Sequence, residues 1–226
     1  MLRAVIFDFD GVITDSEILH FRAFNEVLGR HGIKITTKDY YGTYLGFSDA
    51  DCFKLLVKQG RLEADERGVA DLIRQKNAIF EELASSEGRI IEGVREFLCA
   101  LEQNDVPMAI CSGALLAEIE LILQEARLRN FFDVIVAAEH VEKGKPDPEG
   151  FLLTLEKLNT NATSPISARQ CVVVEDSHWG LRAAIAAGMH AVAVTNTYDA
   201  DQLSMSEKTV GGLGELTVSD LQQLCR

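Results

Sequence analysis

Short apolar runs recur along the chain, separated by helix-like stretches and polar turns. These runs lie at residues 4–9, 108–112, 134–136, 172–174 and 191–195. They are nearly continuous in apolar side chains and too short for helices, as expected for strands that are buried on both faces. Helix-like stretches follow the second and fourth runs, at residues 114–128 and 181–187. Strands that alternate with helices predict an α/β fold with a doubly wound parallel sheet.

Residues 16–86 show a different pattern. They are rich in charged residues and contain no comparable apolar run. Their apolar residues recur at helical spacing, as in Phe21 and Leu28. We therefore predict an α-helical insert over residues 16–86, within a core formed by residues 1–15 and 87–226.

The composition is that of an ordinary globular domain, with 47% hydrophobic and 25% charged residues. No apolar run approaches the roughly 18 residues that a membrane span needs. Lysine and arginine number 22 against 35 aspartates and glutamates, which gives a net charge of −13. Such a surface repels nucleic acid and anionic membranes, so we expect neither as a partner, and no protein partner can be inferred. An anionic ligand would require a local cation or metal.

The cysteines and the first residues favour a cytoplasmic location. The five cysteines are odd in number and form no C-x-x-C pair, as expected in a reducing compartment. The segment from Met1 to Asp10 reaches two aspartates before any signal-peptide core could form.

Polar residues of three chemical kinds mark the ends of the apolar runs. Carboxylates mark the first and fourth runs, a hydroxyl marks the second, and a lysine follows the third across a short connection. The residues are Asp8, Asp10, Ser112, Lys145, Glu175 and Asp176. Since the carboxyl ends of parallel strands share one edge of the sheet, these side chains should meet there. They predict oxygen ligands for a hard cation, with a positive charge beside them.

Each of these residues, taken alone, has an ordinary structural explanation. A D-x-D pair at a strand end is often only turn chemistry, and Ser112 could cap the next helix. Lys145 could be a solvated lysine, and Glu175 and Asp176 could favour the dipole of the following helix. Their joint placement at four strand ends makes a ligand site the stronger hypothesis.

Four segments resemble the motifs of the haloacid dehalogenase superfamily, in the same order and spacing over essentially the whole chain. They are Asp8–Ser16, Cys111–Gly113, Lys145–Pro148 and Val174–Ser177. The helical insert resembles the α-helical cap of the subgroup that includes β-phosphoglucomutase and phosphoglycolate phosphatase. The resemblance implies a Rossmann-like core with a cap domain, in agreement with the pattern of the chain.

The resemblance also implies a chemical role for each motif residue. Asp8 would be the nucleophile that forms an aspartyl-phosphate, and Asp10 would be the general acid and base. Mg²⁺ would be held by Asp8, Asp176 and the main-chain carbonyl of Asp10, with Glu175 as a further ligand or a partner of the ligands. The phosphate-binding residues would be Ser112, Gly113 and Lys145.

Substrate selection is expected to come from the cap. The loop that contains Gly46 and Ser48 should face the active site, and His20 matches a cap-hinge residue of the mutase. Arg74 and Lys76 lie on a predicted helix, where a solvated face is favoured over contact with an anionic substrate.

The expected activity is Mg²⁺-dependent hydrolysis of a small phosphorylated metabolite, such as a sugar phosphate or a phosphoglycolate-like acid. The alternative is a phosphosugar mutase of the β-phosphoglucomutase type. In that mutase the matching loop has a lysine before the glycine and an arginine after the serine, whereas this chain has Leu45 and Asp49. An aspartate repels a second phosphate, so this departure favours the phosphatase.

Three other functions agree less well with the motifs. Metal-free dehalogenases do not use a second aspartate as acid and base, so Asp10 argues for phosphoryl transfer. Phosphonatases form a Schiff base with a cap lysine, and nothing marks Lys54 or Lys58 as desolvated. A non-enzymatic metal-binding domain would be supported by a missing motif residue, and none is missing.

Overall fold

The chain folds into two units. The structure is a computed structural model that describes residues 1–45 and 47–226. The first unit, here called the cap unit, is residues 16–88; the second, the core unit, is residues 1–15 and 89–226. The second boundary lies two residues beyond the one expected from the sequence, because the last helix of the cap unit runs to Glu87.

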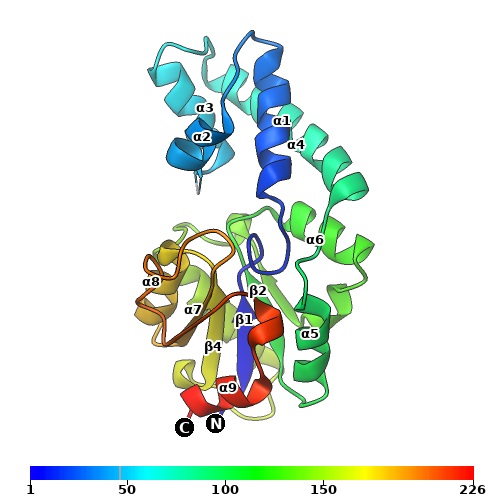
Figure 1. The fold of residues 1–226 in the computed structure, drawn as a ribbon, viewed down its shortest axis with the longest axis vertical. Helices are drawn as coiled ribbons and strands as arrows, with labels where there is room; N and C mark the ends of the chain where they lie inside the picture. The colour runs from blue at the N-terminus through cyan, green and yellow to red at the C-terminus, as the bar shows by residue number, and fades with distance from the viewer. Residues whose placement is uncertain (46) are drawn as a thin grey trace. The chain divides into compact units, whose positions relative to one another are not determined.

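The core unit contains a six-stranded sheet in the order β3-β2-β1-β4-β5-β6, in which all neighbouring strands are parallel (Figure 1). Its strands are β1 (Ala4–Phe7), β2 (Met108–Cys111), β3 (Val134–Val136), β4 (Cys171–Glu175), β5 (His190–Val194) and β6 (Lys208–Val210). Its α-helices are α5 (Val94–Glu102), α6 (Leu116–Glu125), α7 (Glu149–Asn161), α8 (His178–Ala186) and α9 (Val218–Leu224). Short 3₁₀ helices are η2 (Arg129–Phe131), η3 (Ala138–His140), η4 (Ala168–Gln170) and η5 (Leu213–Glu215). The predicted Rossmann-like α/β fold is confirmed.

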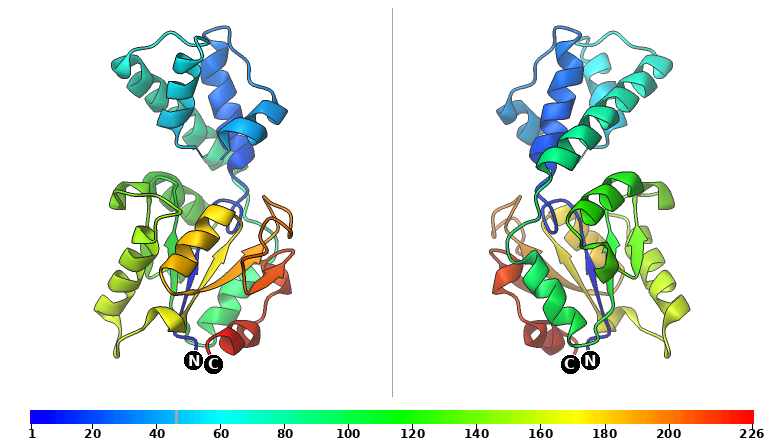
Figure 2. Two further views of the ribbon diagram at one scale, coloured as in Figure 1. Left: turned by 90° about the vertical axis from the view of Figure 1, so that its left-hand side faces the viewer. Right: turned by 90° about the vertical axis from the view of Figure 1, so that its right-hand side faces the viewer.

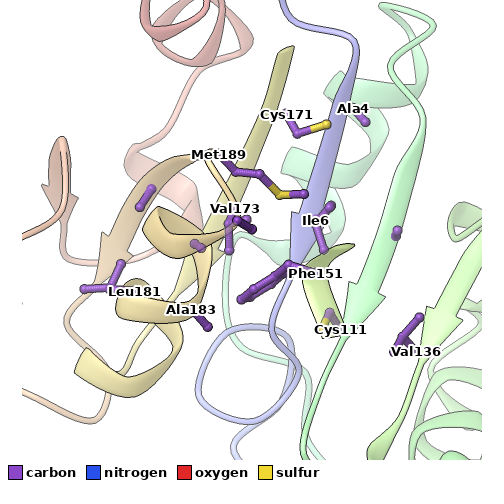
Figure 3. Close-up of a cluster of buried hydrophobic side chains, with 14 of the residues drawn as sticks. Ala4, Ile6, Cys111, Val136, Phe151, Cys171, Val173, Leu181, Ala183 and Met189 are labelled. Carbon is purple, nitrogen blue, oxygen red and sulfur yellow. The ribbon is translucent and has the colours of Figure 1, made fainter. Parts of the chain in front are cut away.

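Helices cover both faces of this sheet (Figure 2). On one face, Ile6 of β1 belongs to a buried cluster with Phe151 of α7 and Leu181 of α8 (Figure 3). Successive strand residues point to opposite faces, so Phe7 lies on the other side. There it packs edge-on against Phe97 of α5, with ring centroids 6.3 Å apart. Burial on both faces explains why the strands appear as continuous apolar runs in the sequence.

The described residues of the cap unit form helices and connections, without a strand, as expected for the insert. The elements are α1 (Glu17–Gly29), α2 (Thr37–Asp39), the π-helical turn η1 (Tyr40–Tyr44), α3 (Asp49–Lys58) and α4 (Glu66–Glu87). The unit has its own apolar core, in which Phe24 of α1 stacks on Phe53 of α3 at a centroid distance of 4.5 Å. Among the described residues, no helix of either unit is both long and apolar enough to cross a membrane.

The apolar pattern does not predict β6, α7 or α9. Strand β6 has three residues, is partly exposed and lies at the edge of the sheet, so it carries no apolar run. Helix α7 begins directly after the Lys145–Pro148 motif, and α9 has only seven residues. Short and exposed elements give a weak periodic signal, which explains these omissions for β6 and α9.

Candidate active site

The candidate active site begins where β1 ends. Asp8 follows the strand directly, and its main-chain N–H donates to the carbonyl of Val174 in β4 at 2.9 Å. The chain then turns tightly, and Gly11 has φ 77°, a left-handed conformation that favours glycine. A side chain on Gly11 would overlap the carboxylate of Asp176 and crowd the hydroxyl of Thr197. The turn after β1 is therefore packed tightly against the residues that follow β4 and β5.

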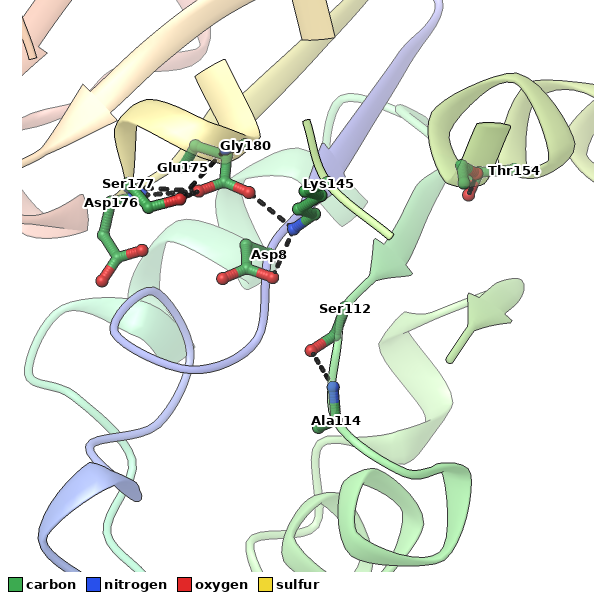
Figure 4. Close-up of polar contacts among 10 residues, drawn as sticks. Asp8, Ser112, Ala114, Lys145, Thr154, Glu175, Asp176, Ser177 and Gly180 are labelled. Atoms are coloured by element: carbon green, nitrogen blue, oxygen red, sulfur yellow. Dashed lines mark hydrogen bonds and ion pairs between the residues drawn. The ribbon is translucent and has the colours of Figure 1, made fainter. Parts of the chain in front are cut away.

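Lys145 bridges two of the carboxylates (Figure 4). Its ammonium lies 2.7 Å from Asp8 Oδ1 and 2.5 Å from Glu175 Oε1. Burial alone would lower the pKa of Lys145, but the two carboxylates raise it above its usual value. The lysine therefore stays positively charged beside Asp8.

Glu175, at the end of β4, has no exposed surface. Its Oε2 accepts hydrogen bonds from the N–H groups of Asp176 and Ser177 and from the Ser177 hydroxyl, at 2.9–3.2 Å. The same hydroxyl accepts from the N–H of Gly180 and so caps α8. A side chain on Gly180 would overlap the Glu175 carboxylate. Because protein donors engage both of its oxygens, Glu175 is better suited to organising the site than to direct metal binding.

The carboxyl groups of Asp8 and Asp176 have raised pKa values. Burial raises the pKa of Asp8 to about 7, an effect that Lys145 opposes and that Glu175 and Asp10 increase. Burial also raises the pKa of Asp176 well above its usual range, with further contributions from Glu175 and Asp8. Burial is the main cause of both shifts and the neighbouring carboxylates add to it; a bound cation would favour the ionised forms.

The carboxylate geometry fits a hard divalent cation. One oxygen each from Asp8, Glu175 and Asp176 lies within 4.8 Å of the others. Carboxylate oxygens are the ligands that Mg²⁺ prefers, so Asp8 and Asp176, with Glu175 organising them, could hold the cofactor expected from the sequence. The carboxylate of Asp10 is not a member of this group; the metal contact expected of Asp10 concerns its main-chain carbonyl.

Ser112 and Gly113 lie where β2 ends. The Ser112 hydroxyl is buried and accepts from the N–H of Ala114 at 3.0 Å, in the turn before α6; the cap of that helix is Leu115 instead of Ser112. A hydroxyl that accepts can still donate its own proton to a ligand. Gly113 has open space where a side chain would be. Their binding of phosphate stays a prediction.

Lys76 and His20 form a cluster inside the cap unit. The Lys76 side chain is 1% exposed, and its Nζ lies 2.9 Å from Asp49 Oδ2 and 2.7 Å from His20 Nδ1. His20 stacks on Phe80 with ring centroids 4.0 Å apart. Burial, reinforced by Lys76, lowers the pKa of His20 well below its usual value. The expectation of a solvated Lys76 is wrong, because Asp49 supplies a compensating charge within the unit.

The other cap residues named from the sequence have local roles or are not described. Arg74 is exposed and pairs with Asp71, as expected for a solvated helix face. The Ser48 hydroxyl accepts from the N–H of Asp51 at 3.2 Å and caps α3. Gly46 lies outside the described residues.

Sequence reasoning overlooked three residues of the site. Thr197, in the loop after β5, donates its hydroxyl to Asp176 Oδ2, and Asn196 donates from Nδ2 to the carbonyl of Gly11 at 2.7 Å. The position of Thr197 and Asn196 in the sequence could have indicated their role, since the loop after β5 leaves the same edge of the sheet as the motif loops. Gly180 precedes the helix predicted at residues 181–187, so the sequence pattern gave no signal for its contact with Glu175.

These features define a class of protein: an α/β enzyme with a helical insert after its first strand and a lysine-bridged carboxylate cluster at its central strand ends. A sequence profile described as haloacid dehalogenase-like hydrolase matches residues 5–194. The chain therefore belongs to the haloacid dehalogenase-like hydrolase family, as the resemblance implied.

Known relatives include a phosphatase and a mutase. The chain is 31% identical over 192 residues to a phosphorylated carbohydrates phosphatase of Thermotoga maritima, with 84% of each chain covered. It is 29% identical over 197 residues to β-phosphoglucomutase of Bacillus subtilis, covering 85% of this chain and 83% of the mutase. The crystal structure of CbbY from Rhodobacter sphaeroides in complex with phosphate has the same fold, with a TM-score of 0.88 at 23% identity, over 98% of this chain and 100% of that one. The predicted enzyme class, a hydrolase of this family with a mutase as the related option, is confirmed.

Proposed function

We propose that this protein is a Mg²⁺-dependent phosphatase of a small phosphorylated metabolite and that turnover passes through an aspartyl-phosphate on Asp8. The main support for this proposal is the position of the Lys145 ammonium, which pairs with Asp8 and Glu175, two members of the three-carboxylate group. A carboxylate nucleophile and a phosphate monoester repel each other, so their reaction requires positive charge at this place. The relative that acts on phosphorylated carbohydrates supports the substrate class.

Asp8, Asp176 and the main-chain carbonyl of Asp10 would hold Mg²⁺, while Glu175 would organise them through Lys145 and the turn into α8. When bound, the ion would neutralise the phosphoryl oxygens and align them with the nucleophile. Lys145 would favour the ionised form of Asp8, since it opposes the rise in the pKa of that carboxyl that burial causes. The same ammonium, with donors from the Ser112–Gly113 turn, would stabilise charge on the transferring phosphoryl group.

Asp10 would carry the proton in both chemical steps. In the first step, an Asp8 oxygen bonds to phosphorus, the bond to the leaving oxygen breaks, and the Asp10 carboxyl gives its proton to that oxygen. In the second step, the Asp10 carboxylate takes a proton from water, whose oxygen bonds to phosphorus as the bond to Asp8 breaks. Asp10 is partly exposed, whereas Asp8, Glu175 and Asp176 are buried, which suits a residue that exchanges protons with water.

The pairing of cap charges favours a phosphatase over a mutase. A mutase must hold a substrate that carries a second phosphate, which requires cations. In the cap unit, Lys76 is buried against Asp49, Arg74 pairs with Asp71, and position 45 is leucine. These pairings reduce the positive charge that the cap unit could offer, so we propose net release of phosphate to water. Mutase activity is the alternative, supported by the Bacillus subtilis relative.

Phosphate release from a panel of sugar phosphates and small phosphorylated acids tests the proposal. Release is expected with Mg²⁺ and not in EDTA, and Asp8→Asn should abolish it. Asp10→Asn should lower the rate by about 10²–10⁴-fold, the usual contribution of general acid–base catalysis. The exposed Asp133, which directly precedes β3 and lies outside the four motifs, gives the matched control: Asp133→Asn should keep full activity.

A coupled assay with β-glucose 1-phosphate, glucose 6-phosphate and a bisphosphate activator separates the two activities. Mutase turnover faster than phosphate release would decide for the alternative. Full activity of Asp8→Asn, or full activity in EDTA, would contradict the mechanism.

A further inference from the structure

The loop after β5 reaches the carboxylate cluster, although it contains none of the four motifs. The Thr197 hydroxyl donates to Asp176 Oδ2. The neighbouring Asn196 donates from Nδ2 to the main-chain carbonyl of Gly11 at 2.7 Å. Gly11 belongs to the turn that directly follows Asp8 and Asp10. Two adjacent residues of one loop therefore hold both segments that carry candidate metal ligands.

Close packing at Gly11 indicates that the loop after β5 is held in place by contacts with the ends of other strands, and not only by hydrogen bonds within the loop. A side chain at this position would overlap Asp176 Oδ2 and lie 2.8 Å from Thr197 Oγ1. Segments from the ends of β1, β4 and β5 thus meet with no room for a methyl group. An ordinary turn after β5 would not require contact with two other strand ends.

Thr197 differs chemically from Lys145, the partner of the other two carboxylates. Lys145 pairs Asp8 and Glu175 with a positive charge, whereas the threonine hydroxyl is neutral. A hydroxyl occupies one acceptor position of a carboxylate and fixes its rotation, but it leaves the negative charge in place. Asp176 is thereby held in one orientation and stays available to a cation.

We propose that Thr197, assisted by Asn196, is a positioning residue that orients Asp176 for a divalent cation, an inference that rests on the proposed metal site. Residues that orient metal ligands typically change metal affinity or activity by about 10–100-fold when they are replaced. Thr197 is exposed, so its replacement removes the hydroxyl rather than core packing.

Isothermal titration of Mg²⁺ into the metal-free protein tests this role without relying on turnover. Thr197→Val, which exchanges the hydroxyl for a methyl group, should weaken Mg²⁺ binding by about 10–100-fold. Thr197→Ser keeps the hydroxyl donor and should bind Mg²⁺ within about threefold of wild type. Asn196→Ala should weaken binding less, because it acts on the Gly11 turn rather than on the Asp176 carboxylate. Thermal unfolding should stay cooperative in all three variants, which ensures that the affinities compared are those of folded proteins.

Thr209→Val provides the matched control. Thr209 is an exposed threonine on the edge strand β6, and its hydroxyl contacts the Ser206 hydroxyl at 2.8 Å instead of a carboxylate. This variant should bind Mg²⁺ as wild type does. Equal affinities of wild type and Thr197→Val would overturn the positioning role and leave the proposed function intact. Absence of Mg²⁺ binding by the wild-type protein would overturn the metal site itself and this role with it.

Discussion

Replacing Gly180 by alanine should destabilise the protein, although such a change ordinarily stabilises a helix. Gly180 is the third residue of α8, and a glycine in a helix is less favourable than alanine by up to about 1 kcal/mol. Here, however, the added methyl group would overlap the carboxylate of Glu175, which is fully buried. The helix propensity of alanine would raise the free energy of unfolding, and the steric overlap would lower it. The surroundings of Glu175 decide which effect is larger.

The Glu175 carboxylate is held by four hydrogen bonds in the structure. It accepts from the Lys145 ammonium, from the N–H groups of Asp176 and Ser177, and from the Ser177 hydroxyl. A hydrogen bond to a charged group contributes about 1.5–3 kcal/mol. A rotation that relieves the overlap would break at least two of them, a loss of about 3–6 kcal/mol against the gain of about 1 kcal/mol. The free energy of unfolding should therefore fall by about 2–5 kcal/mol.

Urea denaturation of the metal-free protein measures this free energy directly. Gly29→Ala is the matched control, because Gly29 is the last residue of α1 and a methyl group there would meet no atom within 4 Å. The control should be neutral or more stable by up to about 1 kcal/mol. Phosphate release should fall in Gly180→Ala and not in Gly29→Ala. If Gly180→Ala were as stable and as active as the control, Glu175 would not be locked in place and the reasoning would be refuted.

The metal-free protein should lose stability as the pH rises from about 4 to about 7. The pKa of Asp8 is about 7 in the folded state and 3.8 ordinarily, so between these pH values the folded protein keeps a proton on Asp8 that the unfolded chain has lost. This proton stabilises the folded state at low pH, and its contribution disappears as the pH approaches 7. The urea midpoint of Asp8→Asn should therefore vary less with pH than that of the wild type. A double-mutant cycle with Lys76→Met and Asp49→Asn should give a coupling energy of about 0.5–3 kcal/mol in urea denaturation, and strict additivity would contradict the buried ion pair. Thr14→Val should lower the free energy of unfolding by about 1–3 kcal/mol, because the carbonyl of Arg89 loses its hydroxyl donor; an unchanged urea midpoint would contradict this.

Most of the core fold can be predicted from the sequence because of how its strands are buried. Strands covered by helices on both faces must be apolar at nearly every position, and β1, β2, β3, β4 and β5 all show this pattern. Strand β6 lies at the edge of the sheet and is partly exposed, so nothing in its composition sets it apart from a loop. The motif residues are equally accessible to sequence reasoning, since strand ends place them at one edge.

The contacts of Thr197 and Lys76 could not be predicted in the same way. Thr197 reaches Asp176 only because the loop after β5 folds back toward the end of β4, and no regular spacing encodes that path. A lysine on an amphipathic helix is ordinarily solvated. Lys76 is buried because Asp49, on a different helix, lies opposite it within the cap unit. Both cases depend on pairs of residues brought together by tertiary structure alone.

In the proposed function, the charges at the sheet edge explain how so acidic a chain could bind a phosphate monoester. The strand ends bring four carboxylates, Asp8, Asp10, Glu175 and Asp176, and one lysine, Lys145, which pairs with two of them; if all are ionised, the excess is three negative charges. A divalent cation would reduce that excess to one, and the proton that Asp10 must carry to the leaving oxygen would remove the last. The substrate would then meet a neutral site instead of a repulsive one. In this proposal, the metal ion and the proton on Asp10 together remove the negative charge that would otherwise repel the phosphate. Thr197 orients the Asp176 carboxylate with a neutral hydroxyl, so it leaves this balance of charge unchanged.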